Sequence, residues 1–195
     1  MGDVRAMVAA MALLWGCAGA REAAPGPEHG DAAPAGGEAR AADALERFVD
    51  AEAGFEIGRP AGEAWQFAPG HPAPDGILVP VVVLDAATGS QVVVQVTPAV
   101  ASPRDFAERL AVGLRSKPGF TTTVRVGSVD GSSSGFSFAL GDEVQGRVGI
   151  TANDEGRLYV LLATWPADVP ESVVGDVDRI MRSLRPFAAR SAVAK

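Results

Sequence analysis

The sequence contains one cysteine, Cys17, and two histidines, His29 and His71. A single cysteine cannot form an intramolecular disulfide, and neither histidine has a second histidine or a cysteine at metal-binding spacing. Lysine and arginine number 17 against 24 aspartates and glutamates, which gives a net charge of −7. This acidic balance excludes nucleic acid as an expected partner, because neutralising phosphates needs a concentrated basic patch. No Walker, Rossmann or calcium-loop motif occurs, so we expect no cofactor and no bound metal.

The N-terminus lacks an apolar run long enough to cross a bilayer, which takes about 20 residues. It carries instead a short run from Ala6 to Trp15 after Arg5, followed by Gly16 and Cys17. That layout is typical of a secretory signal. The ending Leu-Trp-Gly-Cys resembles the bacterial lipobox, in which the cysteine becomes the lipidated N-terminus, although Trp15 stands where a small residue is usual. We therefore expect lipidation at Cys17; the alternative is an ordinary signal peptide cut after this cysteine.

Residues 18–42 contain no aromatic residue and no Val, Ile or Leu. Such a segment cannot bury enough apolar surface to offset ordering, and we interpret it as a tether that would span about 25 to 30 Å as a flexible coil. Ala18 follows the cysteine where an inner-membrane retention signal commonly has aspartate, which favours the periplasmic face of the outer membrane. The chain then divides into a signal peptide (1–16), a lipidated cysteine and tether (17–42), one domain (43–187) and a C-terminal tail (188–195).

The domain begins with an expected helix, because Asp43 and Glu46 form a capping box ahead of apolar residues at helical spacing. Strands are predicted from Phe55 to Pro60 and again near Trp65. The β-branched runs 77–86 and 90–100 predict a hairpin, in which Pro80 requires an edge or a bulge. Ser102 and Pro103 mark the start of a second helix.

Strands are then expected in FTTTVRVGSV, FSFAL, VQGRVGIT and RLYVLLATW, with turns at GSSSG, GDE and NDEG. A capping box from Asp168 to Glu171 predicts a last helix. Its apolar face is expected to bury Val173, Val177, Ile180, Met181 and Leu184. Strands and helices without regular alternation indicate an α+β fold with an antiparallel sheet flanked by helices.

The motif GSSSG matches G-x-S-x-G, which presents a catalytic serine in many esterases. A nucleophile elbow needs a helix directly after the motif and a histidine later in the chain. The sequence after Ser133 alternates as a strand does, and both His29 and His71 precede it. We interpret Ser133 as a turn residue, and we expect no catalytic residue in the chain.

Three arginines, Arg179, Arg182 and Arg185, recur at three-residue spacing in the last predicted helix. They are candidates for docking an acidic partner or lipid; the alternative is a solvated face that complements the helix dipole.

The order of these features resembles the PsbP-like family, which includes the extrinsic photosystem subunit, the Ran-binding Mog proteins and DcrB-like bacterial lipoproteins. The resemblance covers residues 54–187 and rests on GFEI with a following proline and tryptophan, two apolar strands, the SPRD helix, GRLYVLL, and the ending IMRSLRPF. It implies an α-β-α sandwich and non-catalytic, partner-binding roles. We expect a lipid-anchored envelope protein that binds or scaffolds another protein. A carrier or sensor of a small or lipidic ligand is the alternative, and an enzyme with an unrecognised site is third.

Overall fold

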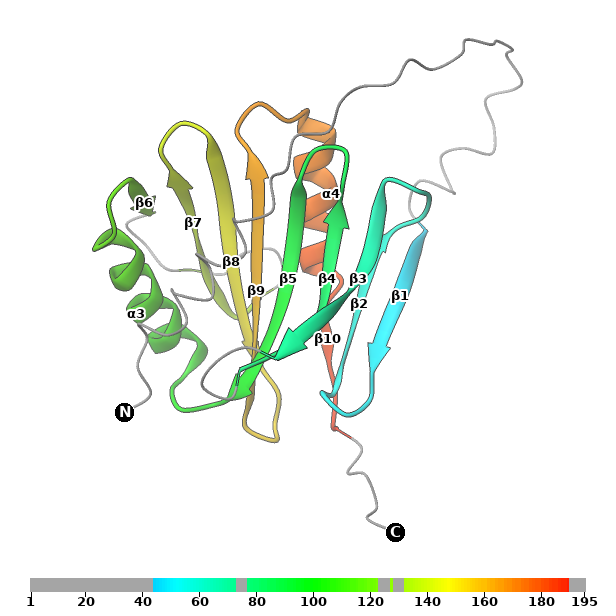
Figure 1. The fold of residues 1–195 in the computed structure, drawn as a ribbon. Coiled ribbons are helices and arrows are strands. Elements are labelled where there is room, and N and C mark those ends of the chain that lie inside the picture. The colour runs from blue at the N-terminus through cyan, green and yellow to red at the C-terminus, as the bar shows by residue number, and fades with distance from the viewer. Residues whose placement is uncertain (1–43, 73–76, 123–126, 128–131, 190–195) are drawn as a thin grey trace.

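The computed structural model describes residues 44–72, 77–122, 127 and 132–189 (Figure 1). The elements, in chain order, are β1 (Leu45–Asp50), β2 (Phe55–Pro60), β3 (Trp65–Pro72), β4 (Leu78–Asp85), β5 (Ser90–Pro98), α3 (Pro103–Arg115), β6 (Phe120–Thr122), β7 (Ser134–Leu140), β8 (Val144–Ala152), β9 (Arg157–Pro166), α4 (Glu171–Arg182) and β10 (Arg185–Pro186). They form an antiparallel seven-stranded sheet in the order β3-β4-β5-β9-β8-β7-β6 and a three-stranded sheet in the order β1-β2-β10.

Two apolar clusters cover opposite faces of the seven-stranded sheet. Successive residues of a strand point to opposite faces, so Leu158 and Val160 pack toward α3, whereas Tyr159 and Leu161 pack toward α4 and β2. Figure 1 shows α3 at the β6–β7 end of the sheet and α4 behind β4, β5 and β9. The fold is therefore α+β with three layers, as the sequence predicted: α3, the large sheet, and α4 beside the small sheet.

The predicted helix at the start of the domain is wrong, because β1 and β2 form an antiparallel hairpin. Asp50 closes the loop: its carboxylate accepts hydrogen bonds from the amides of Glu52 and Ala53, at 3.0 and 2.8 Å. Gly54, at a φ of 76°, adopts the left-handed conformation that ends the loop. Phe48 then lies between Phe55 and Phe67, at ring-centroid distances of 6.1 and 5.7 Å. Cross-strand pairing with β2 outweighs the helical spacing in the sequence.

The predicted hairpin of β4 and β5 is confirmed, and its irregularity lies at Pro80. Leu78 pairs with Val96 and Val81 pairs with Val94, so β4 has one residue more than β5 between these pairs. A bulge accommodates a proline, which has no N–H to donate to the ladder.

The two helices begin differently. Ser102 caps α3 as predicted, because its hydroxyl accepts the Asp105 amide hydrogen bond at 3.1 Å. The capping box predicted for α4 is wrong: Pro170 occupies the N-cap with a ψ of 147°, and no side chain caps the helix. A residue before proline is held out of the helical region, so the helix cannot begin at Val169.

Three strands beyond α3 follow the prediction, since β7, β8 and β9 pair in sequence. The turn predicted at GSSSG differs, because Ser134 and Gly135 already pair with β8. The strand predicted from Phe120 is described only as far as Thr122, and residues 123–126 and 128–131 lie outside the described residues.

Candidate functional site

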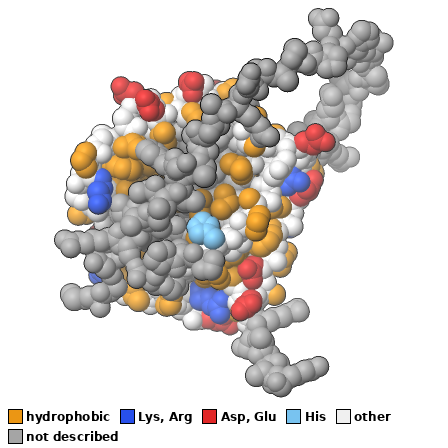
Figure 2. All heavy atoms as spheres, viewed as in Figure 1, with side chains coloured by type: hydrophobic (Ala, Val, Ile, Leu, Met, Phe, Trp, Pro, Cys, Tyr) orange, Lys and Arg blue, Asp and Glu red, His pale blue; other side chains and the backbone are white. Residues whose placement is uncertain are grey.

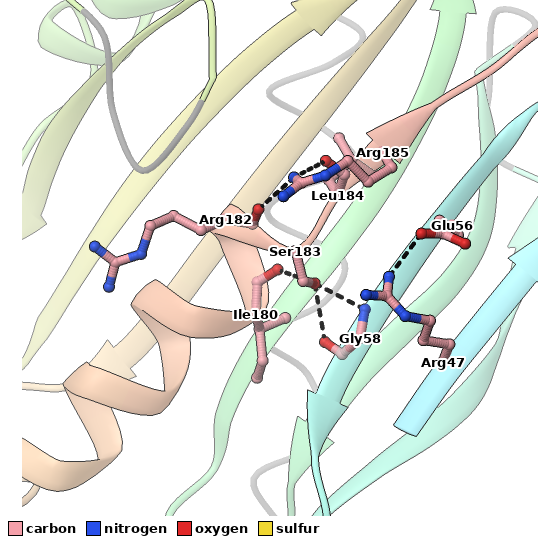
Figure 3. Close-up of polar contacts among 8 residues, drawn as sticks. All are labelled: Arg47, Glu56, Gly58, Ile180, Arg182, Ser183, Leu184 and Arg185. Carbon is pink, nitrogen blue, oxygen red and sulfur yellow. Dashed lines mark hydrogen bonds and ion pairs between the residues drawn. The ribbon is translucent and has the colours of Figure 1, made fainter. Parts of the chain in front are cut away.

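Ser183, the residue directly after α4, forms hydrogen bonds that link the end of this helix to β2 (Figure 3). Its hydroxyl accepts a hydrogen bond from the Gly58 amide at 2.7 Å. The same oxygen lies 2.6 Å from the carbonyl oxygen of Ile180 and 3.2 Å from that of Gly58, which compete for its proton. Because Ser183 is only 6% exposed, these bonds hold α4 and β2 in one layer.

The three predicted docking arginines do not share one helix face. Arg179 is paired with Asp176 on α4. Arg182 is the last residue of the helix and is exposed, whereas Arg185 lies beyond the helix in β10. Nη1 of Arg185 donates to the carbonyl oxygens of Arg182 and Leu184, at 2.7 and 3.0 Å. Arg185 therefore contacts the carbonyl-rich end of α4, where a cation is favourable.

A fourth arginine, Arg47, joins Arg185 on the outer face of the three-stranded sheet. Arg185 is directly paired with Glu56 of β2, and Glu56 is directly paired with Val49 of β1. Arg47 lies two residues before Val49, hence on the same face, and its guanidinium contacts Glu56 at 2.6 Å. We call Arg47, Arg182, Arg185 and Glu56 the arginine face; Figure 3 shows Arg182 at its margin, pointing away from β1.

Sequence reasoning missed Arg47 and Glu56 because it assigned residues 43–54 to a helix. Once β1 and β2 are recognised as a hairpin, the register that places Asp50 opposite Phe55 also brings Arg47 diagonally next to Glu56. The signal was available in Asp50 and Gly54, which are residue types that close tight turns.

Two acidic residues of α4, Asp176 and Asp178, have partners on the large sheet. Asp176 accepts a hydrogen bond from the indole nitrogen of Trp65 at 3.1 Å. Asp178 pairs with Arg147, whose guanidinium lies 5.5 Å from the ring centroid of Trp165. These contacts attach α4 to the large sheet through Asp176 and Asp178, whereas Arg182 at the end of the helix is exposed.

Ser133 lies just before β7, and a strand rather than a helix follows it, as predicted. Its hydroxyl oxygen is 3.1 Å from that of Thr151. His71 belongs to β3, at the far end of the sheet from β7. Five strand spacings separate β3 from β7, which amounts to about 24 Å. These positions do not form a nucleophile and base pair. Cys17 and His29 lie outside the described residues.

Buried polar groups connect three loops around Tyr159. The phenol oxygen lies 2.9 Å from the carbonyl oxygens of both Ala53 and Gly54, and it accepts a hydrogen bond from Asn153 at 3.1 Å. The Asn153 amide also donates to the Phe187 carbonyl at 3.3 Å. Burial raises the pKa of Tyr159; Arg157 opposes this effect, and Glu155 and Asp50 add to it. The network fixes the C-terminal segment against the β1–β2 loop.

A shallow pocket of about 240 Å³ lies beside this network. Its lining comes from the β8–β9 turn and the segment after β10: Thr151, Ala152, Asn153, Asp154, Glu155, Pro186, Phe187 and Ala188. Glu155 already accepts a hydrogen bond from the Ala189 amide at 2.9 Å. Over residues 44–72, 77–122, 127 and 132–189, no cluster of histidine, cysteine and acidic side chains has the grouping of a metal site. In the same part of the chain, no helix is long and apolar enough to cross a membrane.

No family model and no curated protein matches the sequence. Among solved structures, cyanobacterial PsbP (CyanoP) from Synechocystis is similar, with 20% sequence identity and a TM-score of 0.53. The match covers 80% of this chain and 98% of that one. The domain has a PsbP-like fold.

Two further structures are similar at lower TM-scores. The Saccharomyces cerevisiae Ran-binding protein Mog1p is 13% identical, covers 74% of this chain and 99% of its own, and has a TM-score of 0.47. LpqN, involved in cell envelope biogenesis of Mycobacterium tuberculosis, is 14% identical, with coverages of 74% and 92% and a TM-score of 0.46. A PsbP-like fold does not by itself assign a function, which has to be argued from surfaces and sites.

Proposed function

We propose that this chain is a lipid-anchored protein of the bacterial cell envelope whose PsbP-like domain binds a partner protein and carries no catalytic site. The lipid anchor is supported by the lipobox-like stretch from Leu14 to Cys17. In this proposal, residues 18–42 form a tether that holds the domain beyond the lipid headgroups. Ala18 favours the periplasmic face of the outer membrane. In this proposal the partner-binding domain spans residues 43–187 and the C-terminal tail spans residues 188–195.

The arginine face is the observation that carries the binding role. The chain has a net charge of −7, yet Arg47 and Arg185 lie on one face of the small sheet with a single carboxylate, Glu56, and Arg182 lies at the margin of this face. A local positive surface attracts acidic partners. We therefore infer that the partner presents acidic side chains to this face.

A binding domain fits the interior better than a ligand carrier. Leu110 and Leu114 of α3 and Ile150 of β8 are at most 1% exposed, so the described apolar residues between helix and sheet are packed against each other. A carrier of an apolar ligand needs an apolar cavity in such a position.

The anchor is tested by replacing Cys17 with serine and labelling the producing bacterium with a fatty-acid probe. We expect label on the native chain and none on Cys17→Ser. Equal label on both proteins would eliminate the anchor while leaving the binding role open.

The binding role is tested by reversing two charges, Arg182→Glu with Arg185→Glu, and by affinity capture from bacterial membranes. The matched control reverses two exposed arginines of α3, Arg109→Glu with Arg115→Glu. We expect the first pair to abolish capture with little change in melting temperature, and the second pair to preserve it. Equal loss from both pairs would show that only net charge matters.

A further inference from the structure

The two described sheets end in β1, β10, β3 and β6, and the edges of β3 and β10 are protected. Edges are commonly blocked by proline, shortness or charge, because an open edge can pair with another strand. β3 carries Pro69 and Pro72, and β10 has two residues including Pro186, whereas β6 is described only as far as Thr122. β1 has six residues and no proline. Figure 1 shows β1 as the outermost strand of its sheet.

The backbone of β1 alternates between β2 and the open edge. The Ala44 carbonyl accepts a hydrogen bond from the Ala61 amide at 3.1 Å, and the Asp50 carbonyl accepts one from Gly54 at 2.8 Å. Antiparallel ladders repeat this pattern every second residue. The N–H and C=O groups of Leu45, Arg47 and Val49 therefore point away from β2, toward the edge.

The three charged side chains of β1 do not protect this edge, because all three have partners in β2 or in the β1–β2 loop. The Asp50 carboxylate accepts hydrogen bonds from the loop amides of Glu52 and Ala53. Arg47 pairs with Glu56, and Glu46 pairs with Arg59. Val49 is 57% exposed, and Phe48 is half-buried at the margin of the apolar cluster. Among the described residues, no strand pairs with this edge of β1, whose backbone groups lie next to apolar side chains.

We propose that β1 accepts an extended segment of an acidic partner protein as an additional strand of the three-stranded sheet. Acidic residues of that segment lie on the arginine face, beside Arg47, and apolar residues lie beside Phe48. This inference rests on the proposed binding function and specifies how the partner is held.

A second copy of this chain fits the edge poorly. A two-fold antiparallel pairing centred on Phe48 places Glu46 opposite Asp50 of the other copy. Centring the pairing on Arg47 places this residue opposite itself. Like charges directly opposite each other destabilise a strand pair, so the charge pattern of β1 favours a different strand.

The test uses the chain from Ala18 onward, which keeps every described element and both apolar clusters. The probe is a capped heptapeptide in which valine alternates with aspartate, and the control peptide has lysine in place of aspartate. Fluorescence anisotropy measures binding, and amide hydrogen exchange by NMR locates it. We expect the aspartate peptide to bind more tightly and to slow exchange at Arg47 and Val49.

The decisive variant is Val49→Pro, which removes an edge-facing N–H and leaves the bonds from β1 to β2 in place. We expect it to weaken peptide binding about tenfold, the effect of losing a hydrogen bond and its geometry. Val49→Ala, which keeps the N–H, should bind within about twofold. Unchanged binding to Val49→Pro, or protection located at α4, would overturn strand addition. Equal binding of the lysine peptide would overturn the acidic partner.

The two proposals fail in distinguishable ways. If Val49→Pro blocks the peptide but Cys17→Ser still carries lipid label, the strand site stands and the anchor does not. If membrane capture depends on Arg182 and Arg185 but tolerates Val49→Pro, the arginine face binds a partner without strand addition. A dimer that Val49→Pro dissociates in analytical ultracentrifugation would overturn the choice of occupant.

Discussion

Removing the hydroxyl of Tyr159 tests the buried network that joins the C-terminal segment to the β1–β2 loop. The change Tyr159→Phe preserves the ring, so it opens no sizeable cavity in the apolar cluster around Tyr159, which is 0% exposed. The loss is confined to hydrogen bonds at one oxygen, which lies 2.9 Å from Ala53 O and Gly54 O and 3.1 Å from the Asn153 amide nitrogen.

The expected cost follows from the partners that remain. The Gly54 carbonyl still accepts from the Phe187 amide at 2.9 Å, and Asn153 still donates to the Phe187 carbonyl at 3.3 Å. Among the described residues, no other donor bonds to the Ala53 carbonyl once the phenol is removed. Leaving one buried acceptor unsatisfied costs about 1 to 3 kcal/mol, and we expect Tyr159→Phe to lower the free energy of unfolding by about 2 kcal/mol.

Urea unfolding, followed by the fluorescence of the buried tryptophans Trp65 and Trp165, measures this change. Ser133→Ala is the matched control, because it removes a hydroxyl whose contact with Thr151 is exposed. We expect that variant to stay within about 0.5 kcal/mol of the native chain. A cost below about 0.5 kcal/mol for Tyr159→Phe, or equal costs for both variants, would refute the assigned role of the network.

Three further predictions concern the same fold. Burial raises the pKa of Tyr159 in the folded protein, so the stability that its protonated phenol contributes is fully present below the unfolded pKa of about 10 and is lost as the pH rises beyond that value. Because Tyr159 is the single tyrosine, the absorbance of tyrosinate follows its titration directly. A pKa at or below the ordinary value would contradict the prediction. Leu184→Ala should lower the free energy of unfolding by about 2 to 5 kcal/mol, since Leu184 is 7% exposed in the apolar cluster between α4 and the large sheet. Replacing the exposed Arg182 with alanine should lower it by less than about 1 kcal/mol. Similar urea midpoints for the two variants would show that Leu184 does not belong to the core. Gly70→Ala should strongly destabilise β3, because its new Cβ would lie 1.6 Å from the Val79 carbonyl oxygen; an unchanged melting temperature would refute this close approach.

The elements that the sequence predicted correctly are those whose signals are local. Ser102 caps α3 with a hydrogen bond that reaches only three residues along the chain, and Pro103 occupies the first turn, where its missing N–H is not needed. The β-branched runs of β4 and β5 are separated by a short turn, so their pairing needs no distant partner. The alternation of apolar and polar residues after Ser133 predicted a strand and not the helix of a nucleophile elbow, and β7 confirms this strand.

The errors arose where distant residues decide the local conformation. Leu45, Phe48 and Val49 have helical spacing, but the aromatic contacts of Phe48 with Phe55 and Phe67 exist only if β1 is a strand. Spacing alone cannot report a contact formed by another element. The arginine face was incomplete for the same reason, since Arg47 is separated from Arg185 by most of the domain.

The sequence by itself determined the α+β class, the limits of α3 and the β-branched strands, because apolar periodicity and caps act over one or two turns of chain. Tertiary structure decided that residues 45–50 form a strand, that Ser183 links α4 to β2, and that a polar network forms around Tyr159. Each of these depends on hydrogen bonds between residues far apart in sequence, whose partners become neighbours only after the sheets have formed.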